Sequence, residues 1–189
     1  MATKGSHPRP RPRTGRGHSE KKPSKRKDNS LYTSQINAIC RQLDIPSYRG
    51  AYSYEVIPHM GLENNDFCCI MNTDEVSDNG EHWIALVGRK GTIYHFDPFG
   101  LPCINRLIQC WMRDSFKTVK MNDFPIQDHS DTTLTSCGYH CILYIYYKML
   151  TNISFHDFAK LYPLQGTNFA KNEAFAPYEV RVLLVVEDW

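Results

Sequence analysis

The chain has 189 residues, 41% of them hydrophobic and 12% aromatic, which suffices for one domain with a packed core but not for two large domains. The formal net charge of +2 is divided unevenly, because residues 1–30 hold ten of the 22 Lys and Arg but only Glu20 and Asp28 among the acids. The remainder carries 12 basic and 18 acidic residues, a net charge of −6. No stretch has the length and apolar character of a signal peptide or a transmembrane helix, so we expect a soluble, intracellular protein without a membrane partner.

The cysteine count argues against a small disulfide-bonded secreted domain. Seven is an odd number, and the spacing shows no regular framework, with cysteines at positions 40, 68, 69, 103, 110, 137 and 141. This usage favours a reducing compartment.

Residues 1–30 contain Pro, Gly, Ser and charged residues but almost nothing that could enter a core, so we predict a disordered basic arm followed by a folded domain over 31–189. Lys and Arg neutralise phosphates without needing a fold, which suits binding to nucleic acid or a nuclear import signal. A solubilising tail without a partner is the alternative. The candidate nucleic-acid-binding residues are Arg9, Arg11, Arg13, Arg16, Lys21, Lys22, Lys25, Arg26 and Lys27.

The predicted elements of the folded part begin with a helix capped by Thr33 or Ser34 and ending before Pro46. Its apolar face holds Ile36, Ile39, Cys40 and Leu43. Three β-branched and aromatic runs of strand length follow, at residues 67–72, 82–88 and 92–97. Arg89-Lys90-Gly91 is a link of hairpin size between the last two runs, so these strands should pair in antiparallel fashion.

The second half of the chain adds helices. Residues 102–114 start with Pro102 and place Ile104, Leu107, Ile108 and Trp111 at helical spacing, and a short strand is expected at 117–121. Residues 138–150 are apolar almost all round, which predicts a helix buried in the core. Ser154 and Asp157 form a capping-box pattern that opens a further helix. The tail from Tyr178 is compatible with a strand or with a helix that starts at Pro177.

These elements predict an α+β fold, in which a small mixed or antiparallel sheet packs on a central buried helix. No internal repeat is visible.

Three residues in this layout suggest chemistry. If the strands 82–88 and 92–97 form a hairpin in which paired residue numbers add up to about 179 or 180, His82 lies opposite Asp97. A carboxylate beside an imidazole fixes its tautomer and stabilises the imidazolium. Cys137 precedes the buried helix, where unpaired N–H groups and the helix dipole favour a thiolate nucleophile. Gly138 would let a substrate backbone approach closely.

Each of these residues also has a structural interpretation. A cysteine on an apolar helix is usually a core residue, a histidine at a strand start is usually structural, and an aspartate before proline is a common turn residue. Metal binding is a further alternative for Cys137, His140 and Cys141, but no second pair at zinc-finger spacing accompanies them, so we expect no metal.

The blocks HWIALVG, YHFDPFG and SCGYHC resemble the signature blocks of the adenovirus protease (adenain) family, which also includes proteases of large DNA transposons and other DNA viruses. The similarity runs from about Asn37 to Leu150 and is weak beyond. It implies a papain-like fold with circularly reordered elements and a cysteine endopeptidase in which Cys137 is the nucleophile, His82 the base and Asp97 the third member.

The resemblance further implies an oxyanion hole formed by a glutamine side chain and the backbone N–H of the cysteine. Gln127 is the candidate, although it lies ten residues before Cys137 where the family's spacing is typically six or seven. His129 is the rival donor. Trp83 resembles the family's aromatic residue after the histidine, with packing over the site or a place in the core as its two interpretations.

The leading function is therefore a viral or transposon maturation protease that cuts structural precursor proteins. By resemblance no cofactor is implied except an activating peptide and DNA, with Cys103 and Cys110 as candidate tether points. We expect a monomer that binds DNA through its arm, in the virion and host nucleus if viral and otherwise in nucleus or cytoplasm. A deconjugating protease for ubiquitin-like modifiers and a non-enzymatic nucleic-acid-binding structural protein are the alternatives.

Overall fold

The computed structural model describes residues 30–63, 65–73, 82–128, 135–162 and 169–186. The nine basic residues from Arg9 to Lys27 that were predicted to bind nucleic acid lie outside the described residues, as does His129.

A five-stranded mixed sheet forms the centre of the fold. Its spatial order is that of the sequence, and both outer pairs are parallel whereas the two inner pairs are antiparallel. The strands are β1 (Tyr48–Ser53), β2 (Phe67–Asn72), β3 (Trp83–Arg89), β4 (Thr92–Phe96) and β5 (Thr118–Met121). The predicted α+β class is therefore confirmed, but β1 was missed because Gly50 and the polar residues around it obscure its strand pattern.

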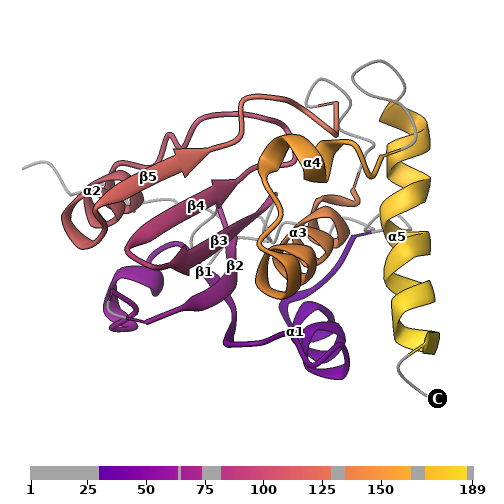
Figure 1. Ribbon diagram of the computed structural model, residues 1–189, viewed down its shortest axis with the longest axis horizontal. Coiled ribbons are helices and arrows are strands. Elements are labelled where there is room, and N and C mark those ends of the chain that lie inside the picture. The colour runs from indigo at the N-terminus through magenta and orange to yellow at the C-terminus, as the bar shows by residue number, and fades with distance from the viewer. Residues whose placement is uncertain (1–29, 64, 74–81, 129–134, 163–168, 187–189) are drawn as a thin grey trace, which may run out of the picture.

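Helices cover both faces of the sheet (Figure 1). On one face α3 packs against the sheet, and α1, α4 and α5 surround α3. On the other face α2 and the 3₁₀ turn η1 enclose a second apolar core. The helical elements are α1 (Thr33–Gln42), η1 (Ile57–His59), α2 (Arg106–Ser115), α3 (Cys137–Thr151), α4 (Phe155–Ala159) and α5 (Phe169–Val186).

Strand β3 is the buried centre of the sheet. Side chains alternate between the two faces of a strand, so Trp83, Ala85 and Val87 join the core under α3. Ile84 and Leu86 join the core on the α2 side. Burial on both faces explains why this segment is a continuous apolar run.

The β3–β4 hairpin has a different register from the one predicted. Arg89 pairs with Thr92 and Ala85 with Phe96, so paired residue numbers add up to 181. The reason is the turn: Lys90 and Gly91, with φ of 50° and 72°, form a two-residue link in which both central residues have positive φ, whereas the prediction allowed for three residues. His82 and Asp97 consequently lie just beyond the paired residues and are not cross-strand neighbours.

Two helices begin at residues other than those predicted. α1 starts at Thr33, with Tyr32 rather than Thr33 or Ser34 as N-cap. α2 starts at Arg106, where the Asn105 side chain accepts a hydrogen bond from the Ile108 N–H. Pro102 therefore does not open α2, and Ile104 lies outside it with 88% of its surface exposed.

The remaining helices follow the sequence pattern more closely. α3 includes the whole predicted range 138–150. Ser154 caps α4 by accepting a hydrogen bond from the Asp157 N–H, as the capping pattern predicted. Residues 178–186 of the ambiguous tail belong to α5, which contains Pro177 in its interior rather than at its start. None of the helices in the described ranges combines the length and apolar character required to cross a membrane.

Gly100 lies where the loop after β4 crosses the chain that follows β5. Its φ is +68°, and a Cβ there would lie 2.5 Å from the backbone carbonyl carbon of Phe124. Gly91 has a similar φ of +72°, but a Cβ at that position would meet nothing within 4 Å.

We therefore expect Gly100→Ala to lower the free energy of unfolding by about 1–3 kcal/mol more than Gly91→Ala, because both variants strain φ but only the first forces two backbone segments apart. Urea denaturation of the two variants measures the difference. Equal losses would show that the segments at Gly100 and Phe124 separate without cost.

Candidate active site

The side chains of His82 and Asp97 are in direct contact where β3 begins and β4 ends. Nε2 of His82 lies 2.8 Å from Oδ1 of Asp97. The side chains are only 12% and 8% exposed, so solvent screens the contact weakly. The contact predicted from the sequence is thus present, even though the two residues are not paired across the hairpin.

Asp97 is held by its backbone as well as by its side chain. Its N–H donates to Oδ1 of Asn122, 2.8 Å away, and its carbonyl accepts from Nδ2 of Asn122. The Phe99 N–H donates to Oδ1 of Asp97 at 2.8 Å. The side chain of Asn122 therefore makes the hydrogen bonds that a further residue of β5 would make, and it fixes the carboxylate that faces His82.

The ring of His82 is held from its face by Phe99, whose ring stacks on it with centroids 4.1 Å apart and planes 14° from parallel. Burial lowers the pKa of His82, but the contact with Asp97 and the neighbouring Cys137 raise it more, to about 9. At neutral pH the ring is therefore an imidazolium. With Nε2 on Asp97, the other ring nitrogen is left for the Cys137 side.

Cys137 is the first residue of α3 and is 7% exposed. The first N–H groups of a helix have no partner within it, so the start of α3 presents hydrogen-bond donors beside this side chain. The ring of His82 adjoins it. The structure thus brings the three residues His82, Asp97 and Cys137 together.

His140 and Cys141, one turn into α3, are part of the core. Nε2 of His140 is 2.9 Å from Oγ of Ser136, and its Nδ1 is 2.8 Å from the Tyr162 hydroxyl. Sγ of Cys141 donates to the carbonyl of Trp83. In the described ranges, no group of three or more His, Cys, Asp or Glu side chains is arranged to hold a metal ion.

Gln127 is fully buried close to the start of α3. Its backbone N–H donates to the carbonyl of Pro98, next to Asp97, at 3.0 Å. Neither atom of its side-chain amide has a hydrogen-bond partner among the residues that the structure describes. The amide is close enough to Glu173 of α5 to contribute to the lowering of that carboxyl's pKa.

Two residues predicted to contact substrate have other neighbours. Trp83 is 5% exposed, and its indole N–H donates to the carbonyl of Leu31. Of the two interpretations that the sequence left open, the structure therefore favours a place in the core. A Cβ on Gly138 would meet Leu31 at 3.3 Å, because this position of α3 faces α1. The absence of a side chain at Gly138 therefore lets α3 pack closely here, and the approach of a substrate backbone to Gly138 stays a prediction.

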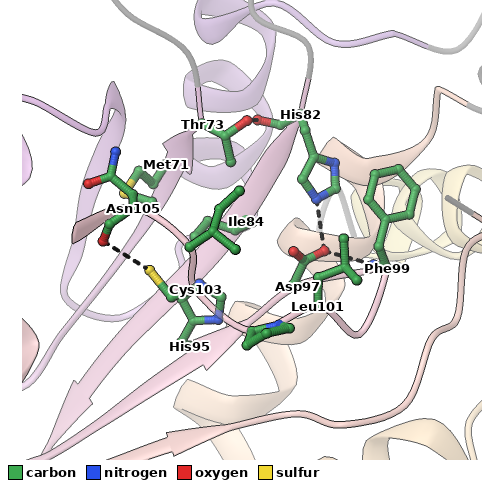
Figure 2. Close-up of a pocket in the computed structure, with 12 residues that line it drawn as sticks. Met71, Thr73, His82, Ile84, His95, Asp97, Phe99, Leu101, Cys103 and Asn105 are labelled. Atoms are coloured by element: carbon green, nitrogen blue, oxygen red, sulfur yellow. Dashed lines mark hydrogen bonds and ion pairs between the residues drawn. The ribbon is translucent and has the colours of Figure 1, made fainter. Parts of the chain in front are cut away.

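A cavity of about 470 Å³ adjoins the contact between His82 and Asp97 (Figure 2). Its other walls are mostly apolar and include Met71, Ile84 and Leu101. His95 also lines this cavity; burial lowers its pKa to about 4, so its ring stays neutral where that of His82 is charged. His82, just before β3, and His95 of β4 thus differ in charge, because of these two only His82 has a carboxylate in direct contact.

Sequence reasoning missed Asn122 and Phe99. The only local signal for Asn122 is an amide that directly follows a strand. Phe99 was part of the quoted block YHFDPFG, but nothing in the pattern places its ring on His82.

No known protein-family model matches the chain. The protease of porcine adenovirus A serotype 3 is 26% identical over 127 residues, which cover 59% of this chain and 60% of the relative. The chain thus spans about 60% of the curated relative's length.

Among solved structures, the pS273R protease of ASFV is similar with a TM-score of 0.50 and 19% identity, over 82% of this chain and 68% of that chain. The SUMO protease Ulp1 is similar at a TM-score of 0.48 and 11% identity, over 83% of this chain and 78% of that chain, which is too distant to inform on function. The resemblance to the adenovirus protease predicted from three sequence blocks is confirmed.

The raised pKa of His82 gives a prediction that does not depend on activity. A pKa above the ordinary 6.5 stabilises the folded state below pH 6.5, and this contribution is lost as the pH rises through about 9. Asp97→Asn should lower the His82 pKa, because an amide cannot stabilise the imidazolium by charge. NMR titration of the His82 ring measures this pKa in the wild type and in the variant.

Asp114→Asn, on the exposed side of α2, is the matched control and should leave the pKa of His82 unchanged. An equal His82 pKa in wild type and Asp97→Asn would contradict the assignment of Asp97 as its charge partner.

Proposed function

We propose that this protein is a cysteine peptidase whose nucleophile is Cys137, with His82 as acid and base and Asp97 as the group that orients His82. The observation that carries the proposal is the 2.8 Å contact of Asp97 with a charged His82 beside the first residue of α3. The same order of residues in the three blocks shared with the adenovirus protease family supports it.

The proposed reaction begins with the Cys137 thiolate attacking the carbonyl carbon of the scissile peptide bond. His82, already protonated, then donates its proton to the leaving amine as the C–N bond breaks and an acyl-enzyme thioester remains. Neutral His82 next takes a proton from the water that hydrolyses the thioester. Asp97 keeps Nε2 occupied, so the nitrogen on the Cys137 side performs each transfer.

The tetrahedral intermediate needs donors for its oxyanion. The backbone N–H of Cys137, at the helix start, is one candidate. The side chain of Gln127 is the other, because it is buried near Glu173, which binds the Ser136 N–H, and its amide atoms have no partner among the described residues. His129, the rival donor, lies outside the described residues.

The proposed substrate class rests on the cavity beside His82 and Asp97 and on the resemblance to the adenovirus protease family. The apolar cavity beside His82 and Asp97 has a size that suits an amino-acid side chain of a protein substrate. We propose structural precursor proteins of a virus or transposon as substrates, with residues 31–189 as the catalytic domain. Deconjugation of ubiquitin-like modifiers uses the same residue order and is an outcome that the assay must distinguish.

The basic arm is proposed to bind DNA. The ten Lys and Arg of residues 1–30 stand against two acids, whereas the rest of the chain is acidic. A DNA-bound protease would work where its substrates and the genome are packed together, in a virion or a nucleus.

Alkylation with iodoacetamide at pH 6 tests whether Cys137 is a reactive thiolate. We expect Cys137 to react faster than Cys110, although Cys110 is exposed and Cys137 is 7% exposed, because the thiolate and not the thiol attacks. His82→Ala should remove this advantage. Peptide mapping by mass spectrometry measures both rates, and a faster Cys110 in the wild type would contradict the proposed ion pair.

Peptidase activity itself is tested by digestion of a proteome-derived peptide library. We expect new N-termini with the wild type and none with Cys137→Ser, which keeps the size of the side chain but not its nucleophilicity. A parallel arm offers ubiquitin-like modifiers with Gly-Gly tails. Cleavage confined to those tails would replace precursor processing by deconjugation, and equal cleavage by Cys137→Ser would end the thiol mechanism.

For DNA binding we expect log affinity to fall linearly with log salt concentration, because Lys and Arg release counterions from phosphates. Deletion of residues 1–30 should remove most of the affinity and flatten the slope. Unchanged binding by the deletion variant would assign the DNA contact to the domain, and absence of binding by the full chain would leave the arm as a solubilising tail.

A further inference from the structure

The first turns of α5 reach the candidate oxyanion site from behind. α5 lies alongside α3 on the side away from the sheet (Figure 1). Asn172 and Glu173 are 1% and 8% exposed, although both are polar. Burying polar and charged groups is costly unless they make specific contacts, so their partners indicate what they do.

The partners are the residues that precede the two candidate oxyanion donors. Oε2 of Glu173 accepts a hydrogen bond of 3.3 Å from the backbone N–H of Ser136, the residue before Cys137. Nδ2 of Asn172 donates to the carbonyl of Ile126, the residue before Gln127, at 2.9 Å. Two adjacent residues of one helix thus hold both chain segments that must converge on an oxyanion.

The remaining polar atoms of Glu173 and Gln127 are complementary to each other, one an acceptor and the other a donor. Oε1 of Glu173 lies 3.8 Å from Nε2 of His140 and has no hydrogen bond among the described residues. The buried amide of Gln127 is likewise unmatched there. An amide nitrogen has two N–H donors, so one can point to Glu173 while the other points to the reacting carbonyl.

The protonation state of Glu173 fits this arrangement. Burial raises its pKa, but the nearby ring of His140, the hydrogen bond from the Ser136 N–H and the nearness of Gln127 lower it more, so the side chain is a carboxylate and can only accept. Burial lowers the pKa of His140, which leaves that ring neutral. A carboxylate beside Gln127 favours the amide orientation whose nitrogen faces it, and the second N–H of that nitrogen can then point to the site.

We propose that Asn172 and Glu173 are positioning residues that fix the oxyanion hole, with Glu173 orienting the Gln127 amide and both holding the chain beside the two donors. This inference rests on the proposed peptidase function. It assigns a role to α5, which lies beyond Leu150, where the motif resemblance to adenain-like proteases is weak.

Glu173→Gln tests the orientation. The oxygen of the new side chain can still accept from the Ser136 N–H. Its amide nitrogen, however, now faces the N–H donors of Gln127, and two donors repel each other. The Gln127 amide should therefore rotate and offer its oxygen to the oxyanion. On a peptide found by the library digestion we expect kcat to fall about tenfold to a hundredfold with KM changed by less than about twofold. Glu179→Gln, the same change farther along α5, should match the wild type.

Alkylation of Cys137 separates positioning from general damage to the fold. Displacement of iodide by the thiolate forms no oxyanion, so Glu173→Gln should lose kcat and keep the wild-type alkylation rate and thermal midpoint. Parallel loss of cleavage, alkylation and thermal stability would overturn the proposal in favour of a purely structural role. Asn172→Ala should show the same selective loss of kcat and serves if Glu173→Gln does not fold.

A double-mutant cycle with Gln127→Ala completes the test. Gln127→Ala alone should lower kcat by about a hundredfold to a thousandfold, and adding Glu173→Gln should then cost little more. Full additivity would contradict action through Gln127. A wild type that cleaves by Cys137 while Glu173→Gln is fully active would overturn this inference alone, whereas activity without Cys137 would overturn the proposed function.

Discussion

The contact between His82 and Asp97 is the constraint on which the site depends. Both residues lie outside the hairpin pairing, so the sheet alone does not hold them together. Asn122 replaces the missing ladder bonds at Asp97, and the Phe99 ring limits rotation of the imidazole. The contact in turn sets the charge of His82, because burial by itself would favour the neutral ring. His95 shows that outcome, since without a carboxylate in contact its pKa is low.

The layers of the fold place Cys137 beside this contact. His82 directly precedes β3, whose Trp83 face packs under α3, so the first residue of α3 comes next to the imidazole. α5 lies behind α3 and reaches the chain on either side of the undescribed segment 129–134. The site is thus assembled from the end of a hairpin, the beginning of a buried helix and a supporting helix that is distant in sequence.

The sequence predicted the parts of this site that have strong local patterns. Apolar runs identified β2, β3, β4 and α3, and the blocks around His82, Asp97 and Cys137 predicted that these three residues meet. The hairpin register was wrong because it depends on a turn of two rather than three residues, which composition does not resolve. The packing of Gly138 against Leu31 was not foreseen, because a glycine that faces a neighbouring segment looks the same in sequence as one that faces a substrate.

Long-range polar contacts were beyond sequence reasoning altogether. Asn122 is 25 residues from Asp97, and Glu173 is 37 residues from Ser136, so no periodicity links the partners. Their effect is nevertheless local, because each fixes one or two atoms beside the proposed reacting groups. α5 itself was ambiguous in sequence because its valines favour a strand and Pro177 favours a helix start, whereas in the fold α5 is a helix beside α3.

The central claim is that the thiolate of Cys137, paired with the imidazolium of His82, attacks a peptide carbonyl and forms a covalent bond to it. A peptidyl vinyl sulfone, built on a cleaved sequence from the library, places an electrophilic carbon where the scissile carbonyl would lie. Intact-mass spectrometry followed by peptide mapping should find one adduct per molecule, on Cys137, that is lost in His82→Ala. An adduct on Cys110 or on several cysteines, or none at all while the peptide is still cleaved, would contradict the account.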